Sequence, residues 1–351
     1  MILKKINLTR LILGVIISIM VCFGSWAQET IELRGATITT LSEPRGQAGL
    51  RFIELVEAKS KGRIKGTWYH SGQLGAESEI QEQLLENTIQ FASYSAAVAG
   101  QLNPKVTTMY CPYLIKSWEV FKDKWIGSKG AQLILDSLQG NGLQGLGWVP
   151  YGFNALDYRG EPILKLEDIP GRRIRSAEIY SIRETILALG ADAPTTPWSD
   201  VYQAVQMNLV DGFTAPPSTI APSSLYEVVD KMTLSNHLFG SHILWIRQDV
   251  LDNLPEDLRN IVLESAEEAC AWEQAQMLDF EKQSIKDLVE NKGMTAYELE
   301  EEEMERWIEA TNKVWSIHEE KINEKSGDGR EFLIEVFASM GRDYEKEVLG
   351  Q

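Results

Sequence analysis

The chain has 351 residues, of which 44% are hydrophobic and 24% are charged, and its formal net charge is -17 at pH 7. This composition is typical of a globular protein, and the length favours two domains or one large domain. No nucleic-acid partner is expected, because phosphate contacts require a basic surface that so acidic a chain does not offer.

The first 27 residues predict a secretory signal peptide that is not part of the fold. Lys4, Lys5 and Arg10 precede the apolar run LILGVIISIMVCFG, and small residues follow at Ser25 and Ala27. The apolar run is too short for a comfortable membrane span. We therefore expect cleavage near Ala27 and export of the mature chain to a bacterial periplasm.

After this leader, strands and helices alternate in a first block. Residues 31–40, 64–70 and 89–100 predict strands, and residues 43–63 and 75–88 predict helices. The third strand is nearly all apolar, as in a parallel strand covered on both faces. The order β-α-β-α-β indicates an α/β layer architecture.

A second block repeats the alternation. An aromatic, strand-like run over 143–160 is followed by a strand within 165–178, a helix that ends at Gly190, and a helix and strand within 197–214. Two further strand-like runs fill 226–250.

The C-terminal third has a different character. Residues 255–293 contain no internal proline and predict one long helix or two abutting ones, more than 50 Å in length at about 1.5 Å per residue. The acidic run at 298–307 begins a further helix, and its charges are interpreted as a solvated helix face.

One glycine pattern suggests chemistry that its context excludes. Gly140, Gly142 and Gly145 have the G-x-G-x-x-G spacing, but here a helix precedes them and a strand follows, the reverse of a dinucleotide site. We interpret Gly140 and Gly142 as helix-ending residues. There is no G-x-S-x-G, Walker-type loop, H-E-x-x-H or clustered Cys/His spacing, so neither a cofactor nor a metal is expected.

Two cysteines, Cys111 and Cys270, remain after the leader. Export permits a disulfide, but two buried free thiols are the preferred interpretation, and the sequence leaves the pairing open.

Several motifs between residues 72 and 237 occur in a specific order. They are GQLG at 72–75, GRRIR at 171–175, ALGA at 188–191, PWSDVYQAVQ at 197–206, VDG at 210–212 and LSNH at 234–237. Together they resemble the periplasmic solute-binding proteins of TRAP (tripartite ATP-independent periplasmic) transporters. The likeness covers nearly the whole mature chain.

This resemblance implies an α/β, two-domain periplasmic binding protein with a ligand cleft between the domains, hinge strands and a long domain-spanning helix. Residues 28–151 plus 241–285 would form domain I, and residues 152–240 plus 286–351 would form domain II. Such a protein is not an enzyme. It closes on a small organic anion and delivers it to the membrane subunits of a TRAP permease.

The resemblance also implies ligand-binding residues. Arg175 matches the carboxylate-binding arginine, whose planar fork meets a carboxylate with two charge-assisted hydrogen bonds. Arg172 lies on the opposite strand face, and Arg173 is interpreted as a charge on the rim. Trp198 matches the pocket aromatic residue. Tyr94 and Ser95, at the end of the third strand, and Thr39 and Thr40, after the first, are candidates on domain I.

Two departures from the family pattern bear on the ligand. Asn154 stands where many members have a second arginine, and Phe213-Thr214-Ala215 replaces x-Glu-Asn after VDG. Arg175 would then carry the anion recognition almost alone. Aromatic residues near these positions lead to the hypothesis of a ligand with one carboxylate and an apolar or aromatic body. Asn154, Phe213, Thr214, Phe239 and His242 complete the candidate site, and Trp148, Tyr151 and Phe153 could add apolar surface.

Two alternatives stay open on the sequence. A secreted enzyme, for example a thiol hydrolase that uses Cys111, would need a reactive thiol. A ligand sensor would have the same binding residues but signal to a membrane receptor instead of a permease.

Overall fold

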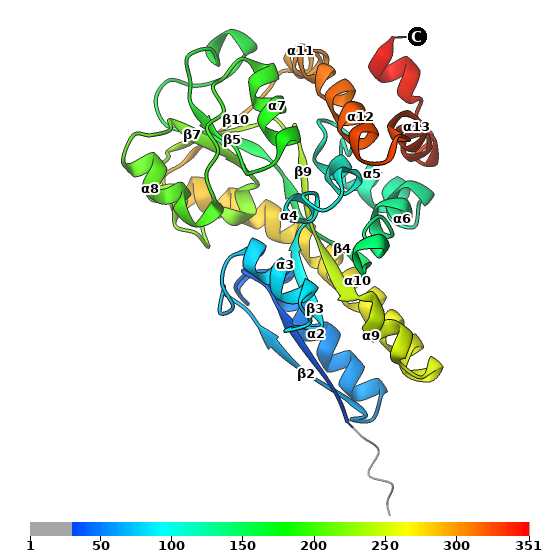
Figure 1. Cartoon of the computed structure of the whole chain (residues 1–351). Coiled ribbons are helices and arrows are strands. Elements are labelled where there is room, and N and C mark those ends of the chain that lie inside the picture. Colours follow the sequence, from blue (N-terminus) through cyan, green and yellow to red (C-terminus); the bar gives the residue numbers. More distant parts are fainter. Residues whose placement is uncertain (1–29, 351) are drawn as a thin grey trace, which may run out of the picture.

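The computed structural model describes residues 30–350, which form two mixed five-stranded sheets with helices packed on their faces (Figure 1). The strand order is β2-β1-β3-β9-β4 in the first sheet and β10-β8-β5-β7-β6 in the second. The predicted α/β architecture is therefore confirmed. The predicted signal peptide lies outside the described residues.

The elements have the following bounds. The strands are β1 (Ile31–Ala36), β2 (Ile64–Tyr69), β3 (Phe91–Ser95), β4 (Leu143–Phe153), β5 (Ala155–Tyr158), β6 (Ile174–Arg175), β7 (Gly212–Ala215), β8 (Lys231–Leu234), β9 (Phe239–Arg247) and β10 (Thr295–Glu298). The main helices are α2 (Pro44–Lys59), α3 (Glu77–Leu85), α4 (Ala96–Ala99), α5 (Trp118–Val120), α6 (Lys129–Leu135), α7 (Tyr180–Leu189), α8 (Val201–Gln206), α9 (Gln248–Asn253), α10 (Glu256–Glu290), α11 (Glu301–Thr311), α12 (Lys313–Ser326) and α13 (Gly329–Ser339).

The first sheet follows the predicted β-α-β-α-β order, because β1 pairs in parallel with both β2 and β3. Two predicted strand ends are wrong. The first strand ends at Ala36 instead of residue 40, and the third ends at Ser95 instead of residue 100. In the second case the Ser95 hydroxyl accepts a hydrogen bond from the Val98 amide at 3.3 Å, which caps the short helix α4.

The aromatic run predicted as one strand over 143–160 is two strands in different sheets. Asn154 alone separates β4 from β5, and residues 235–238 separate β8 from β9 on the way back. The backbone N–H of Asn154 donates to the Leu238 carbonyl at 2.9 Å. The two crossings between the sheets therefore lie side by side.

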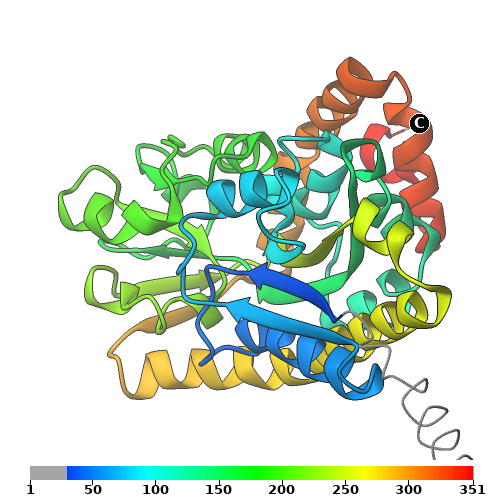
Figure 2. The ribbon, with the colours of Figure 1, turned by 60° about the horizontal axis from the view of Figure 1, so that its bottom comes forward.

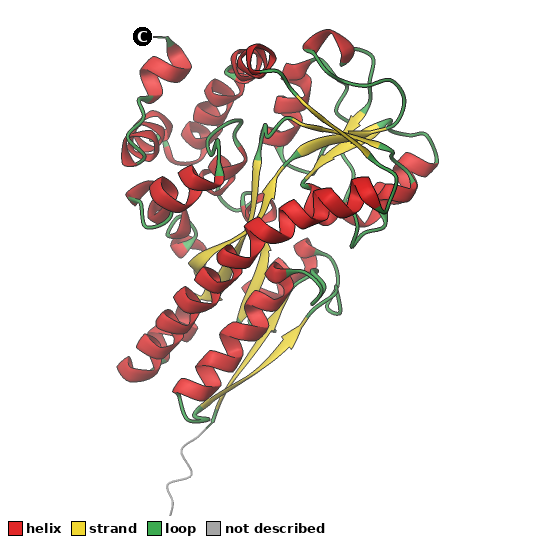
Figure 3. Ribbon diagram, turned by 180° about the vertical axis from the view of Figure 1, so that it is seen from behind, coloured by secondary structure: helices red, strands yellow, loops and turns green. Residues whose placement is uncertain are grey.

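Helix α10 is one uninterrupted helix of 35 residues. This confirms one long helix over two abutting ones, the two possibilities that the sequence left open. It contacts α2 and β4 on one side and β10 and the 3-10 turn η6 (Pro217–Thr219) on the other. Figures 2 and 3 show it running along both halves of the molecule. No helix within residues 30–350 is long and apolar enough to cross a membrane.

The Glu281 side chain of α10 holds the point where the chain crosses between the sheets. Its Oε1 accepts from the Phe153 amide at 2.7 Å, and its Oε2 accepts from Trp118 Nε1 at 2.6 Å. Gly152 has a φ of 102°, and a Cβ there would lie 2.0 Å from the Glu281 carboxylate. Glycine is required at this position by both its backbone and its neighbour.

Three α-helices, α11, α12 and α13, and a short π-helical turn (Glu345–Leu349) follow β10, and the sequence patterns indicated only the first of these helices. Helix α13 packs on α6, and α12 packs on the 3-10 helix η1 (Pro104–Tyr110) and on α7, while α11 also packs on α7 (Figure 1). These helices thus contact parts of both predicted domains, and the domain boundaries stay a prediction.

Replacement of Glu281 by alanine is expected to lower the free energy of unfolding by about 2–4 kcal/mol, because it leaves two buried donors, the Phe153 amide and the Trp118 indole, without an acceptor. Urea unfolding measures this loss. Glu264→Ala, an exposed position on the same helix, is the matched control. Equal stability of the two variants would contradict the role given to Glu281.

Candidate functional site

Charged and aromatic side chains from several elements meet where the first sheet faces the second half of the molecule. We call this group the junction cluster. Its members are Glu43, Arg45, Glu77, Tyr110, Tyr151, Arg175 and His242. Four of them lie at or just beyond strand or helix ends, which is where open α/β sheets place their ligands.

Arg175 is the second half's contribution to the junction cluster. Its side chain is on β6, and the residue is only 4% exposed. Nε donates to the Thr196 carbonyl at 2.7 Å, Nη2 donates to the same oxygen, and the guanidinium lies 5.8 Å from the Trp198 ring centroid. No carboxylate of residues 30–350 lies within 4.0 Å of it.

The charge of Arg175 is therefore buried without a close counter-ion. Burial lowers the pKa of Arg175 to about 10, against the opposing influence of Glu178 and Tyr151. The guanidinium remains protonated at neutral pH, and its Nη1 makes no hydrogen bond with the described residues. An anion receptor requires such a cation, with a donor that its own chain leaves free for a ligand carboxylate.

The neighbouring arginines make different contacts. Arg173 forms a two-pronged ion pair with Asp211, with Nη2 2.6 Å from Oδ1 and Nε 3.1 Å from Oδ2. Arg172 donates to the carbonyls of Arg159 and Glu161 at 3.1 and 2.7 Å. Arg175 thus differs from both in having no strong acceptor other than one backbone carbonyl.

On the first half, Glu43 and Arg45 form an ion pair at the start of α2. Arg45 Nε and Nη2 lie 3.0 and 2.9 Å from the same oxygen of Glu43. The guanidinium lies 4.7 Å from the Tyr151 ring centroid, which adds a cation–π contact. Of the predicted site residues, Thr40 donates to Glu43 at 3.5 Å, and Thr39 is buried next to it against Thr37.

Glu77 and His242 form the second polar pair on this half. Glu77 Oε1 lies 3.2 Å from His242 Nε2 and accepts from the Ser95 amide at 3.0 Å. Burial lowers the pKa of His242, which favours the neutral ring, whereas the His242 and Ser95 hydrogen bonds hold the pKa of Glu77 below its ordinary value in spite of burial. Glu77 is also the first residue of α3, where the helix dipole favours a negative charge.

Tyr151, near the end of β4, contacts Arg45, Tyr110 and His242 of the cluster. Its hydroxyl is hydrogen-bonded to that of Tyr110, which in turn donates to the Ser241 carbonyl at 3.2 Å. The Tyr151 ring passes over Gly240, where a Cβ would come within 2.1 Å of it. Burial is the main reason that the pKa of Tyr151 is raised, and the charges of Arg45, Glu77 and Arg175 all act on it.

Asn154 and Thr214 belong to a chain of hydrogen bonds beside this cluster. Asn154 Nδ2 donates to Thr214 Oγ1 at 3.1 Å, Thr214 Oγ1 lies 2.8 Å from His237 Nε2, and His237 Nδ1 lies 2.7 Å from Ser235 Oγ. Burial lowers the pKa of His237 to about 3, so the ring is neutral. Asn154 Oδ1 is buried and has no partner among the described residues.

The remaining candidates are mostly packed among other side chains. Tyr94 and Phe239 are buried in the large hydrophobic cluster, and Phe213 is buried beneath α8. Trp198 is only partly buried and lies over Arg175. Of the predicted aromatic residues, only Trp198 and Tyr151 are partly exposed to solvent. Ligand contact by any of the predicted aromatic residues stays a prediction.

Sequence reasoning missed four members of the junction cluster, Glu43, Arg45, Glu77 and Tyr110. Glu43 and Arg45 follow the first strand's loop, and Glu77 lies in the GAESE stretch beside the quoted GQLG motif. A signal existed for these three, because each charge stands just beyond a parallel strand at the start of a helix. Tyr110 gave no comparable signal.

Both cysteines are free and buried, which confirms the preferred interpretation. Burial raises the pKa of the Cys111 thiol well above its ordinary value, so this residue lacks the thiolate that a nucleophile requires. Within residues 30–350, no group of three or more His, Cys, Asp or Glu side chains is placed to hold a metal ion.

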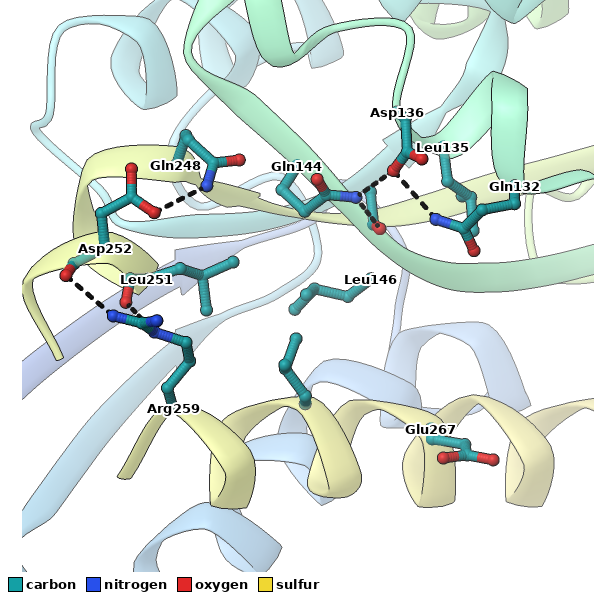
Figure 4. A pocket seen from close by; sticks show the side chains of 12 residues that line it. Gln132, Leu135, Asp136, Gln144, Leu146, Gln248, Leu251, Asp252, Arg259 and Glu267 are labelled. Carbon is teal, nitrogen blue, oxygen red and sulfur yellow. Dashed lines mark hydrogen bonds between the residues drawn. The ribbon is translucent and has the colours of Figure 1, made fainter. Parts of the chain in front are cut away.

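A separate groove lies between α6, β4, α9 and the start of α10 (Figure 4). Its polar side chains mostly bond one another: Gln132 and Gln144 both donate to Asp136 at 2.9 Å, and Gln248 donates to Asp252 at 2.9 Å. None of the sequence-predicted site residues lines it. The junction cluster, which holds an unpaired charge, is the stronger candidate.

Comparison with known proteins gives a family. A family model described as "Bacterial extracellular solute-binding protein, family 7" matches residues 35–322. The chain is 26% identical over 309 residues to the C4-dicarboxylate-binding protein DctB of Bacillus subtilis, covering 88% of this chain and 86% of that protein. It is 26% identical over 272 residues to the ectoine-binding periplasmic protein TeaA of Halomonas elongata, covering 77% and 78%.

A solved structure has the same fold. A TRAP periplasmic solute-binding protein from Desulfovibrio salexigens, with bound orotic acid, superposes with a TM-score of 0.82 at 22% identity, covering 89% of this chain and 99% of that one. The predicted two-domain fold of this family is therefore confirmed.

The Arg173–Asp211 pair should stabilise the fold above the ordinary pKa range of aspartate and stop doing so in acid. The pair lowers the pKa of Asp211, so its contribution is lost as the pH falls through that lowered value. Arg173→Ala should therefore lower the melting temperature at pH 7, and this deficit should become smaller as the pH falls from about 3.9, the ordinary aspartate pKa, toward about 2. Arg183→Ala, an exposed arginine paired only with its neighbour Glu184, is the control. An equal deficit at both pH values would contradict this assignment.

Proposed function

We propose that this chain, which belongs to the bacterial extracellular solute-binding protein family 7 and to its TRAP-transport receptors, holds a small organic anion on Arg175 and delivers it to a TRAP membrane permease. Its family consists of solute-binding transport proteins and not of enzymes. Because burial raises the pKa of the Cys111 thiol, this residue does not support the alternative of a thiol hydrolase.

One observation carries the proposal. Arg175 is a buried cation with one backbone carbonyl as its acceptor and no carboxylate within 4.0 Å in residues 30–350. A buried charge without a partner is costly, and a ligand carboxylate supplies the missing partner with two charge-assisted hydrogen bonds. Two relatives, a C4-dicarboxylate-binding protein and an ectoine-binding protein, support a small polar ligand of this kind.

The location and the membrane partner are part of the proposal. TeaA, the relative from Halomonas elongata, is a periplasmic protein, and the family is one of extracellular solute-binding proteins. These findings support a periplasmic receptor, released by cleavage near Ala27, that hands its ligand to TRAP permease subunits.

The shape of the ligand is proposed from the accessible aromatic rings. Trp198 lies 5.8 Å from the Arg175 guanidinium, and the Tyr151 ring lies 4.7 Å from that of Arg45. Flat apolar faces beside a carboxylate site favour a ligand whose carboxylate is attached to an apolar or planar body.

Arg175→Met is expected to abolish ligand binding without loss of stability. The wild-type protein should gain about 2.7 kcal/mol of unfolding free energy at a ligand concentration one hundred times Kd, and the variant should gain none. Without ligand, the variant should be as stable as the wild type or more so, because it no longer buries an unpaired charge. Thermal unfolding against a library of organic acids measures both effects.

Arg173→Ala is the matched control, since Arg173 already has its carboxylate partner in Asp211. It should keep the ligand-induced stabilisation. Wild-type affinity in Arg175→Met, or the absence of any stabilising acid for the wild-type protein, would contradict the proposed function.

A further inference from the structure

A buried histidine joins the C-terminal helices to both halves of the molecule. His318 lies on α12, where this helix packs on α7 and η1 (Figure 1). Its Nε2 is 2.7 Å from the Thr108 hydroxyl of η1, and its Nδ1 is hydrogen-bonded to the Tyr180 hydroxyl of α7. The Thr107 hydroxyl, also of η1, lies 3.1 Å from the Tyr180 hydroxyl. None of these residues belongs to the junction cluster.

The partners of His318 decide which of its ring nitrogens carries the proton. The Thr108 hydroxyl donates to the Lys105 carbonyl at 2.7 Å, so it must accept from His318 Nε2. Burial lowers the pKa of His318 to about 3, so the ring is neutral and Nδ1 is an acceptor. The Tyr180 hydroxyl therefore donates to Nδ1, and the hydrogen-bond chain from α7 through α12 to η1 has one direction.

This chain connects the second half of the molecule to the first. Helix α12 is also held by Trp315, whose Nε1 donates to the Pro112 carbonyl at 3.2 Å. Residues 104–112 lie in the chain between β3 and β4, which are strands of the first sheet, whereas α7 lies between β6 and β7 of the second sheet. Among residues 30–350, Tyr180 is the one residue of α7 whose side chain is hydrogen-bonded to α12 or η1.

Tyr180 also ends a short connection that begins at Arg175. Strand β6 ends at Arg175, and α7 begins at Tyr180 after an N-cap residue, Ile179, whose side chain makes no capping hydrogen bond. Apart from α7, no other element of the described chain forms a backbone hydrogen bond with residues 177–179. The Tyr180 hydroxyl therefore ties the far end of this connection to α12.

The connection carries an acid that competes with a ligand if it reaches Arg175. Glu178 is exposed, stands three residues after Arg175 and forms no ion pair with it within 4.0 Å. Displacement of residues 177–179 toward the guanidinium would bring the Glu178 carboxylate onto it as an intramolecular competitor of the ligand carboxylate. An Arg175 that stays free for a ligand therefore requires this connection to be held in place.

We propose that Tyr180 and His318 are positioning residues of the anion site, whose hydrogen bond holds residues 177–179 in place and so keeps the Glu178 carboxylate from pairing with Arg175. The inference rests on the proposed function, in which Arg175 holds the ligand carboxylate. Without this hydrogen bond, a self-paired form with Glu178 on Arg175 becomes populated. The apparent Kd then rises by the inverse of the fraction of molecules in which Arg175 stays free.

Tyr180→Phe removes the hydroxyl and keeps the ring that stacks on His318. Titration calorimetry with benzoate, orotate and succinate as probes should give a Kd about three- to tenfold higher than that of the wild-type protein for each probe that binds, the worth of one neutral hydrogen bond. Tyr344→Phe is the matched control. Its hydroxyl is also bonded to α12, at 2.9 Å from Glu319, but it is not part of the connection after Arg175, so this variant should keep the wild-type affinity.

Glu178→Gln supplies a readout that a loss of stability alone would not change. In the Tyr180→Phe background it removes the competing carboxylate, so the double variant should bind within about twofold of Glu178→Gln alone. The single variant should bind within about twofold of the wild-type protein, because the wild type already keeps Glu178 away from Arg175.

The outcomes separate this inference from the proposed function. Wild-type affinity in Tyr180→Phe, an equal loss in Tyr344→Phe, or a double variant as weak as Tyr180→Phe would each overturn the inference and leave the proposed function intact. If circular dichroism shows that Tyr180→Phe is unfolded, His318→Gln, which removes the acceptor at Nδ1, replaces it in each comparison. Failure of every probe to bind the wild-type protein, or full binding by Arg175→Met, would overturn the carboxylate site and this inference with it.

Discussion

The arrangement of the site depends on one buried positive charge. Arg175 is held in place by a backbone carbonyl and an aromatic ring, neither of which neutralises it. Moving a charge out of water costs several kcal/mol unless a partner is supplied, so the rest of the fold must provide the stability that this residue consumes. That stability comes from the apolar side chains buried beneath the two sheets and along helix α10. In the proposed function, the ligand carboxylate supplies the counter-ion that the fold does not give to Arg175.

The three arginines of GRRIR show how one sequence motif divides into different physical roles. Arg172 caps backbone carbonyls, Arg173 pairs with Asp211 of the VDG motif, and Arg175 has no acidic partner. The strand alternation separated Arg172 from Arg175, but Arg173 and Arg175 lie on one face by that rule. What distinguishes them is Asp211, which lies 38 residues further along the chain and reaches Arg173 only through the pairing of β6 with β7.

The sequence predicted the alternating order of strands and helices and the long C-terminal helix, because these features depend on local periodicity. The ligand-binding role of Arg175, which a motif with fixed spacing indicated, stays a prediction. The sequence did not predict that the run around Asn154 crosses between two sheets, because both strands are apolar and one residue suffices for the turn. It also did not indicate that Arg45 contacts Tyr151 or that Glu77 contacts His242. In each contact the two residues are more than one hundred positions apart, so only the folded sheet brings them together.

Asn154 relates the two crossings of the chain to the charge balance of the site. Its amide joins the β4–β5 crossing to the β8–β9 crossing, and its side chain begins the hydrogen-bond chain through Thr214 to neutral His237. An arginine here, as the resemblance leads one to expect, would place a third cation near Arg175 and beside a buried imidazole. The junction would then carry an excess of positive charge and suit a dianion. With asparagine no further charge is added, and the neutral side chain fits the buried crossing, where Asn154 is 4% exposed. The departure from the family pattern at this residue therefore agrees with the proposal of a ligand that has one carboxylate, held by Arg175.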